Sequence, residues 1–287
     1  MQGANFVRPL FVVEAGMNMN IIGVDLGSTM TKVVQIKNNN LKNKGIYSEK
    51  NVEKVIEKFI NDNNIDLTEI EEFVITGVGA SKIKKNIYNK PTKIVNEFEA
   101  IANCVDKNCL IASIGTGTAF ILKNGENAVH LGGSGLGGGT LINLAKELAN
   151  IDDFNNIKEL ILKGNLNSVD LRLKDITQEK LSNLSMDTTV SNFGKIEPNA
   201  NESDMIKGIL NMIMESIAVM CAMALKNTKI KEVVVIGTIT TLPLIKDILK
   251  RVSALHDVSF EIPENSQFLT AVGAVRKEFI SLENHQI

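Results

Sequence analysis

The sequence predicts an α/β fold of two related lobes that face one ligand. Two stretches with the same pattern support this prediction, residues 21–34 (IIGVDLGSTMTKVV) and residues 110–122 (LIASIGTGTAFIL). Each runs from an apolar strand through Gly-Ser or Gly-Thr into a small polar turn and a returning strand, as a β-hairpin does. The 287 residues leave room for two modest lobes with buried cores. We expect an N-terminal lobe over 19–107 and a C-terminal lobe over 108–287, with 1–18 as an extension or a disordered segment.

Hydrophobic periodicity predicts the elements of both lobes. The first lobe should contain a hairpin, a helix, a strand that runs into a glycine turn, and a short strand followed by a helix; their ranges are 20–37, about 50–63, 71–80 and 92–105. The second lobe should open with three antiparallel strands within 109–132 and a helix over about 140–150. A helical or irregular stretch (151–200) precedes a long helix over about 203–227, which we expect Ser203 to cap. A strand at 232–237, a helix from Thr241 and a last helix over about 268–281 complete the chain.

Composition excludes several classes of function. A net charge of −2 gives no basis for electrostatic binding to nucleic acid or to an anionic membrane. Cys104, Cys109 and Cys221 have no metal-site or redox spacing and are typical of small apolar residues in a reducing cytosol. The three histidines show no zinc-ligand spacing. Because we find neither a signal peptide nor an uninterrupted apolar run long enough to span a membrane, we expect a cytoplasmic protein.

The first hairpin carries residue types that bind phosphate. Its turn, with Gly27, Ser28 and Thr29, would present backbone N–H groups and hydroxyls to phosphate oxygens. Asp25 precedes the turn and could hold Mg²⁺, and Lys32 on the returning strand could neutralise phosphate charge. For this decamer alone, an ordinary glycine-rich hairpin is an equally weighted alternative.

The second hairpin repeats the turn but not the carboxylate. Ser113 stands where the first copy has Asp25, and the turn is Gly115-Thr116-Gly117-Thr118. One metal-side carboxylate and one neutral phosphate-binding turn are consistent with a nucleoside triphosphate held between the lobes. Residues 132–139 (GGSGLGGG) also satisfy G-x-G-x-x-G, so a dinucleotide-binding fingerprint is an alternative; the antiparallel strands before it count against that interpretation.

Glu97 follows an apolar strand and precedes a helix. A carboxylate at such a strand end suits a general base that accepts the proton of a substrate hydroxyl. Taken alone, a glutamate that simply stabilises a helix N-terminus is the better explanation.

Taken together and in order, these segments resemble the actin/hexokinase-like (ribonuclease H-like) ATPases, and within them the type II pantothenate kinases. The resemblance extends from Met19 to about Phe279. It is carried by GVDLGSTMTK, VNEFEA, SIGTGTAF, GGSGLGGGT, VDLRLKDI (169–176), SNFG (191–194) and VVIGT (234–238). The resemblance implies a two-lobed fold with a nucleotide cleft between the lobes.

The resemblance also implies ATP- and Mg²⁺-dependent phosphorylation of pantothenate, and it assigns a role to each matching residue. The first phosphate and metal hairpin is matched by Asp25, Gly27, Ser28, Thr29 and Lys32, and the second by Gly115, Thr116, Gly117 and Thr118. Glu97 matches the catalytic base, Gly137, Gly138 and Gly139 match the glycine loop near the phosphates, and Gly237 matches the adenosine-side turn. The resemblance further implies a homodimer built on the long helix.

The sequence departs from the family pattern at His130. The family has Arg two residues before the glycine loop, where it stabilises substrate charge, whereas imidazole is shorter and lacks the bidentate fork. Alternatives therefore stay open. They are a kinase of another small hydroxy acid or a pantetheine-like compound, an ATP-switch activator like those of 2-hydroxyacyl-CoA dehydratases, and a nicotinamide oxidoreductase.

Overall fold

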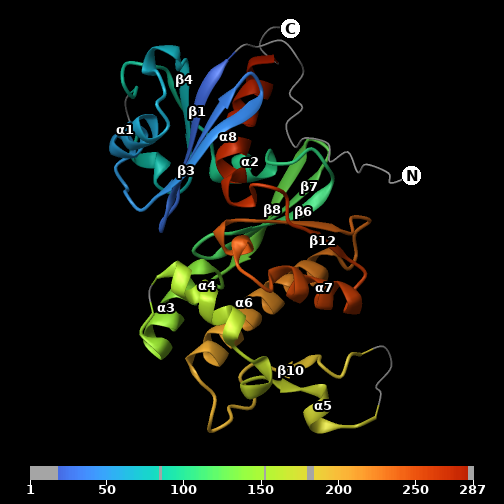
Figure 1. Ribbon diagram of the computed structural model, residues 1–287. Helices are drawn as coiled ribbons and strands as arrows, with labels where there is room; N and C mark the ends of the chain where they lie inside the picture. Colours follow the sequence, from blue (N-terminus) through green and yellow to red (C-terminus); the bar gives the residue numbers. More distant parts are fainter. Residues whose placement is uncertain (1–18, 84–85, 152, 180–183, 284–287) are drawn as a thin grey trace, which may run out of the picture. The chain divides into compact units, whose positions relative to one another are not determined.

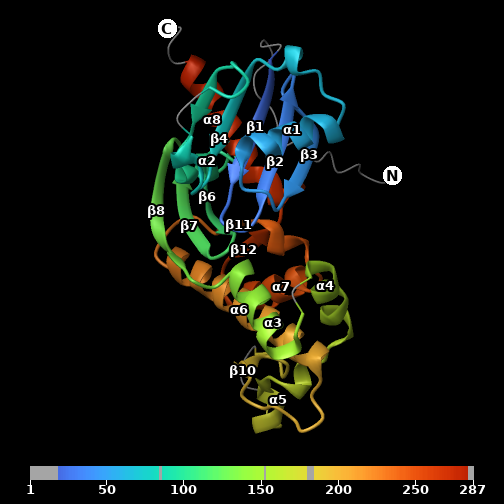
Figure 2. The same ribbon diagram turned by 90° about the vertical axis from the view of Figure 1, so that its left-hand side faces the viewer.

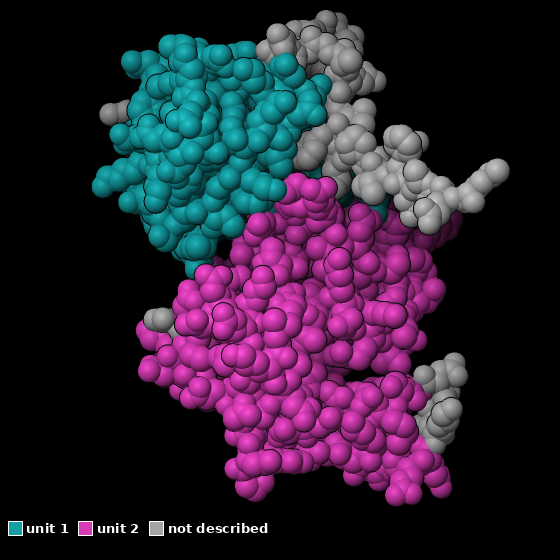
Figure 3. Space-filling view, viewed as in Figure 1, with its two compact units in different colours: residues 1–107, 268–287 teal, residues 108–267 magenta. Residues whose placement is uncertain are grey.

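The computed structural model describes residues 19–83, 86–151, 153–179 and 184–283 (Figure 1). The segment 1–18, expected to be an extension or disordered, lies outside the described residues. The chain divides into two compact units, coloured separately in Figure 3. Unit 1 consists of 1–107 and 268–287, and unit 2 of 108–267.

Unit 1 is a five-stranded mixed sheet with helices on both faces. Its elements are β1 (Asn20–Leu26), β2 (Thr31–Lys37), β3 (Asn40–Tyr47), α1 (Val52–Asp62), β4 (Glu72–Thr76), β5 (Thr92–Ile94), α2 (Glu97–Ala102) and α8 (Leu269–Glu283). The strand order is β3-β2-β1-β4-β5. The first three strands pair antiparallel, and β4 and β5 add parallel to β1.

The alternation of side chains along the strands explains the two covered faces. One face, with Val24, Val33 and Phe73, packs in a single apolar core with Val55 and Phe59 of α1. The opposite face is covered by α8, which contacts β1, β2 and β4 and packs on α2. The side chains of Asp25 and Lys32 belong to this second face, because they alternate with Val24 and Val33.

The last helix differs from the expected division of the chain. The sequence interpretation placed 268–287 in the C-terminal lobe, whereas α8 packs in unit 1. Its buried side chains Leu269, Val272 and Val275 supply the apolar contacts, and Lys277 pairs with Glu99 of α2 at 3.8 Å. The sequence near residue 268 does not show that the following helix packs against strands at the start of the chain. The sequence interpretation therefore placed a single boundary between the lobes, at residue 107.

Unit 2 repeats the topology of unit 1. Its elements are β6 (Cys109–Ile114), β7 (Thr118–Asn124), β8 (Asn127–Ser134), α3 (Gly138–Ala149), α4 (Phe154–Lys163), β9 (Leu171–Arg172), α5 (Leu173–Ile176), β10 (Thr189–Ser191), α6 (Glu202–Leu225), β11 (Glu232–Ile236), α7 (Ile245–Leu255) and β12 (Ser259–Glu261). The larger sheet has the order β12-β11-β6-β7-β8. As in unit 1, three antiparallel strands come first and two parallel strands add beside the first of them. The repeated topology agrees with the two related hairpins in the sequence.

Helices α3, α4, α6 and α7 gather on one side of this sheet (Figures 1 and 2). Leu110, Ala112 and Ile114 of β6 join their apolar residues in one core. The segment expected to be helical or irregular, 151–200, contains α4 and α5 and also a small sheet of β9 and β10, which the sequence interpretation did not anticipate.

Helix α6 passes through the centre of unit 2. It is long and apolar enough to cross a membrane by length and composition, but 61% of its most apolar 18-residue window is buried inside the structure, as in a core helix. The expected cap of this helix was wrong. Asn201, not Ser203, caps the helix, because its side chain accepts from the backbone of Ser203 and Asp204 while Asp204 accepts from the backbone of Asn201.

Candidate active site

The predicted phosphate hairpin places Asp25 directly opposite Lys32. The register of β1 and β2 pairs the two residues, and Lys32 Nζ lies 3.4 Å from Asp25 Oδ2. Both side chains are about nine-tenths buried. Burial raises the pKa of Asp25, and the ion pair with Lys32 opposes this rise. The hairpin therefore holds Asp25 in a desolvated position, where the ammonium group of Lys32 stabilises the ionised form of its carboxylate.

The neighbouring strand β4 completes the surroundings of this carboxylate. Thr76 is paired with Asp25 across the parallel register, so the two side chains lie on the same face of the sheet. The Thr76 hydroxyl is buried, and it has no hydrogen-bond partner among the described residues. Gly77 follows, and a Cβ there would lie 2.7 Å from Asp25 Oδ1. Sequence reasoning missed both residues, because only the pairing of distant strands brings them to Asp25.

Glu97 lies near this ion pair. It is the first residue of α2, and Asn96 before it caps the helix by accepting from the backbone of Phe98 and Glu99. Burial raises the pKa of Glu97, the negative charge of Asp25 raises it further, and Lys32 lowers it. Unit 1 thus brings together the three predicted catalytic residues, Asp25, Lys32 and Glu97.

The turn of the first hairpin lies at the end of this face. Ser28 and Thr29 are exposed and Gly27 is half-buried. The Gly27 carbonyl accepts a hydrogen bond from Lys50 Nζ at 3.1 Å. Lys50 was not predicted as a site residue, because it lies 23 positions along the chain from this turn.

In unit 2 the second hairpin and the glycine loop are bonded backbone to backbone. Gly138 N donates to Gly115 O at 2.8 Å, and Gly139 N donates to Thr116 O at 3.0 Å. Thr118 Oγ1 donates to the carbonyl of Leu136 at 2.8 Å. The predicted residues 115–118 and 137–139 therefore form one cluster.

These bonds change the explanation for the glycines. The family resemblance placed these glycines in a loop near the nucleotide phosphates. In the structure, a Cβ at Gly137 would lie 2.6 Å from Thr116 O and one at Gly139 would lie 2.7 Å from Thr116 Cγ2. Two of the first N–H groups of α3 are also already bonded to the turn. Packing of the loop against the second hairpin is therefore sufficient reason for glycine at 137 and 139.

Gly237 joins the same cluster from β11. This strand runs parallel beside β6, so the two strands end side by side. Gly237 has φ +112°, and a Cβ there would lie 2.0 Å from Ile114 O, so only glycine fits. Thr240 Oγ1 closes the turn by donating to Gly237 O at 2.7 Å. The turns that the sequence assigned to phosphate and to adenosine thus adjoin within unit 2.

His130 lies apart from these turns, on the edge strand β8. It is exposed and pairs in register with Ile121, next to a shift of register at Phe120. The antiparallel pairing of β7 and β8 also removes the dinucleotide-binding alternative, because the fingerprint requires a βαβ unit of parallel strands.

The remaining candidate groups give no second site. Cys104, Cys109 and Cys221 are all buried. Within the described ranges, no group of three or more His, Cys, Asp or Glu side chains is placed to hold a metal ion.

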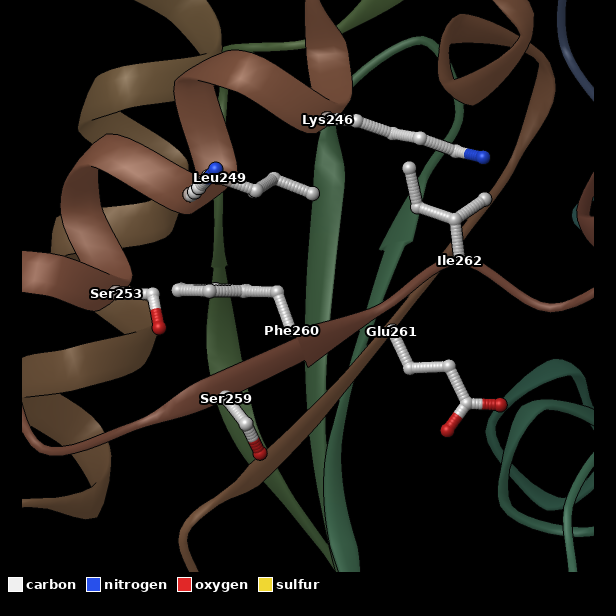
Figure 4. A pocket seen from close by; sticks show the side chains of 8 residues that line it. Lys246, Leu249, Ser253, Ser259, Phe260, Glu261 and Ile262 are labelled. Atoms are coloured by element: carbon white, nitrogen blue, oxygen red, sulfur yellow. The ribbon is translucent and has the colours of Figure 1, made fainter.

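A pocket of about 450 Å³ lies between α7 and β12 in unit 2 (Figure 4). Leu249, Phe260 and Ile262 give it an apolar lining, and Lys246 comes from α7. None of the residues predicted from the sequence lines it.

Comparison with known proteins shows the family of this chain. The family model described as Fumble matches residues 72–251. A type II pantothenate kinase of Bacillus cereus (strain G9842) is 30% identical over 232 residues, which are 76% of this chain and 83% of the relative. A type II pantothenate kinase of Staphylococcus aureus (strain USA300) is 26% identical over 272 residues, 90% of this chain and 99% of the relative.

Solved structures confirm the predicted actin/hexokinase-like fold class. The activator of the 2-hydroxyisocaproyl-CoA dehydratase from Clostridium difficile with bound ADPNP aligns with a TM-score of 0.65 and 18% identity, covering 93% of this chain and 97% of that chain. The ROK hexokinase from Thermus thermophilus aligns with a TM-score of 0.54 and 11% identity, covering 92% and 100%. At these identities the likeness concerns the fold alone.

Proposed function

The chain belongs to the Fumble family of type II pantothenate kinases, and we propose that it transfers the γ-phosphoryl group of ATP to the hydroxyl group of pantothenate. This reaction begins the synthesis of coenzyme A. The observation that carries the proposal is that unit 1 holds a buried ion pair of Asp25 and Lys32, and that the charges of both residues act on Glu97, a carboxyl group whose pKa burial raises.

In this proposal Glu97 is the general base. As the hydroxyl oxygen forms its bond to the γ-phosphorus, the proton passes to the Glu97 carboxylate, and the bond to the oxygen bridging the β-phosphorus breaks to release ADP. A raised pKa makes Glu97 a stronger base than an exposed glutamate. The positive charge of Lys32 offsets the charge that develops on the transferring phosphoryl group.

Mg²⁺ fits the residues around Asp25. Mg²⁺ in phosphoryl-transfer sites is bound by one or two carboxylates, by substrate phosphates and by several waters. Asp25 provides one buried carboxylate, and the hydroxyl of Thr76 beside it is a buried polar group that a water of the metal would satisfy. We assign the metal to Asp25, directly or through water; it would neutralise charge on the β- and γ-phosphates.

The remaining nucleotide contacts are assigned to the turns. Gly27, Ser28 and Thr29 of the first hairpin and Gly115, Thr116, Gly117 and Thr118 of the second would bind phosphate oxygens through backbone N–H groups and hydroxyls. Gly137, Gly138 and Gly139 would pack against the second turn and hold it in place. This replaces the expectation that they lie at the phosphates themselves. Gly237 would lie on the adenosine side.

His130 is proposed to contact the acid substrate. Its imidazole replaces the family's Arg, so it binds a negative group strongly only when protonated. A pantetheine-like compound or another small hydroxy acid is therefore the alternative acceptor.

The structural likeness to a dehydratase activator raises a second candidate, an ATP-driven switch. Such activators hold an iron–sulfur cluster between subunits through paired cysteines. Because Cys104, Cys109 and Cys221 are all buried, we favour the kinase. A homodimer, a cytoplasmic location, and the absence of nucleic-acid and membrane partners belong to the proposal as well.

The test is ADP release measured with a panel of acceptors. Pantothenate, pantetheine and other small hydroxy acids would each be supplied with ATP and Mg²⁺, and each reaction would be compared with an acceptor-free control. Fastest turnover on pantothenate supports the proposal. If another acid is turned over and pantothenate is not, the protein is a kinase but pantothenate is not its substrate. ADP release that no acceptor stimulates would favour the switch.

A further inference from the structure

We propose that Lys50 is a second phosphate-binding cation of the first hairpin, which acts beside Lys32 on the polyphosphate of ATP. The inference rests on the proposed function and adds to it a residue that neither the sequence motif nor the family resemblance assigned. Its basis is the position of the Lys50 side chain over the phosphate turn.

The backbone at Lys50 is fixed to the hairpin. Lys50 lies between β3 and α1, and its N–H donates to Glu49 Oε1 at 2.7 Å, as does the N–H of Asn51 at 2.8 Å. The carbonyl of Glu49 accepts from Thr31 Oγ1 at 3.0 Å. Since Thr31 is the buried first residue of β2, this anchor sets the point from which the Lys50 side chain starts.

The side chain of Lys50 reaches the turn that follows β1. Its Nζ donates to Gly27 O at 3.1 Å. Burial lowers the pKa of Lys50, the neighbouring charge of Lys32 lowers it further, and Asp25 opposes both effects. The ammonium group is therefore close enough to the Asp25–Lys32 pair to interact with both charges.

Lys50 and Lys32 have different hydrogen-bond partners, a neutral carbonyl and a charged carboxylate respectively. Lys32 is already paired with Asp25 at 3.4 Å, so part of its positive charge is neutralised before a polyphosphate binds. The acceptor of Lys50 is a neutral carbonyl, and this hydrogen bond can be exchanged for one to a phosphate oxygen. A hydrogen bond between two charged groups is stronger than one to a neutral acceptor. Lys50 would thus supply net positive charge to the turn.

The experiment compares Lys50→Met with Lys50→Arg and with Lys54→Met. Lys54 is an exposed residue of α1, one turn further along, so its replacement makes the same change in charge without touching the turn. Calorimetry would give the dissociation constants of ATP, tripolyphosphate and adenosine. We expect Lys50→Met to weaken ATP and tripolyphosphate about tenfold relative to Lys54→Met and to leave adenosine unchanged. Lys50→Arg should retain most of the affinity.

Other outcomes overturn the inference in recognisable ways. Equal polyphosphate affinities in Lys50→Met and Lys54→Met would show that Lys50 does not bind phosphate, while the kinase proposal would stand. Equal loss of adenosine and tripolyphosphate binding, or a lowered unfolding temperature that Lys50→Arg restores with no gain in affinity, would assign Lys50 a structural role. If the wild-type protein binds neither ATP nor tripolyphosphate, the proposed function itself is wrong.

Discussion

Asp25 and Glu97 are two carboxyl groups whose pKa values are both raised by burial, and Lys32 lowers both. In the proposed mechanism the two groups have different roles. Asp25, held next to Lys32, would bind the metal ion. Glu97, whose pKa the negative charge of Asp25 raises further, would accept the proton.

The first prediction concerns this base. Glu97→Gln should lower the turnover number by about two to four orders of magnitude, the usual contribution of a positioned general base, and should leave ATP affinity nearly unchanged. Glu99→Gln is the matched control, because Glu99 occupies the same first turn of α2 and is exposed. Steady-state kinetics and calorimetry give both quantities. Near-wild-type turnover in Glu97→Gln would remove Glu97 from the mechanism.

The assignment of Glu97 as general base also predicts how kcat/KM changes at acidic pH. A base acts in its ionised form, so kcat/KM should fall as the pH drops through the pKa of Glu97, which lies above the ordinary value of 4.5. Because Lys32 lowers that pKa, the residual activity of Lys32→Met should fall at a higher pH than that of the wild type. An unmoved acidic limb would contradict the coupling between Lys32 and Glu97.

The second prediction concerns His130. Replacement by Arg should raise kcat/KM on pantothenate about tenfold, since a charge-assisted hydrogen bond contributes roughly 1.5–3 kcal/mol in favourable geometry. His130 is exposed on an edge strand, so the longer side chain meets no packing obstacle. The comparison of His130→Arg with His130→Ala on pantothenate is decisive. Activity unaltered in both variants would show that His130 takes no part in substrate binding.

At this scale the sequence predicted the residues that belong to local motifs. Asp25, Lys32 and the turn residues were singled out from one hairpin. Glu97 was assigned by the family resemblance, because its position at a strand end alone favoured a glutamate that stabilises a helix N-terminus. Lys50, Thr76 and Gly77 were missed, because they reach Asp25 or its turn only through the register of β4 or the anchor at Thr31.

At the scale of elements, the glycine loop and the second hairpin pack closely against each other through their backbones. The third prediction separates packing from ligand binding within this loop. Gly137→Ala should destabilise the protein, because the new Cβ would lie 2.6 Å from Thr116 O, whereas a Cβ at Gly135 meets nothing within 4 Å. The unfolding temperature of Gly137→Ala should therefore be lower than that of Gly135→Ala, by about 2–8 °C for a cost of about 1–2 kcal/mol. Equal unfolding temperatures would refute the packing explanation.

Elements with strong periodicity were predicted closely, and those held by long-range polar bonds were not. Helix α6 and the two hairpins appear within a few residues of their expected positions. The stretch around β9 and β10 depends instead on buried Asp170, which accepts from the backbone of Phe193 at 3.0 Å and from Asn211 Nδ2 at 2.9 Å. Partners 23 and 41 residues away leave no periodic pattern in the sequence.

At the scale of the whole molecule, the fourth prediction is a homodimer. The resemblance implied assembly on the long helix, and the structure narrows the available surface. Met214 of α6 is fully buried within unit 2, whereas Met223 is 67% exposed. We therefore expect any contact along this helix to involve its C-terminal end. Light scattering at micromolar concentration should give twice the 31.4 kDa of the single chain, and a mass near 31.4 kDa would contradict the dimer.

The division into two related units was predictable from the repeated hairpin, and the shared strand order bears out that relationship. The packing of α8 in unit 1 was not predictable, because its buried face contacts strands that lie more than 190 residues earlier in the chain. Only the sheet of unit 1, once folded, distinguishes this helix from a final helix of unit 2.

The central claim is phosphoryl transfer to pantothenate with Glu97 as the base, and the most direct measurement follows the γ-phosphate itself. Purified protein would be incubated with pantothenate, Mg²⁺ and ATP labelled at the γ-position, and the products separated and identified by mass. We predict labelled 4'-phosphopantothenate with the wild type and with Glu99→Gln, and a rate lower by about two to four orders of magnitude with Glu97→Gln. Label that stays in ATP or appears only as inorganic phosphate, in a protein that binds ATP, would contradict the account.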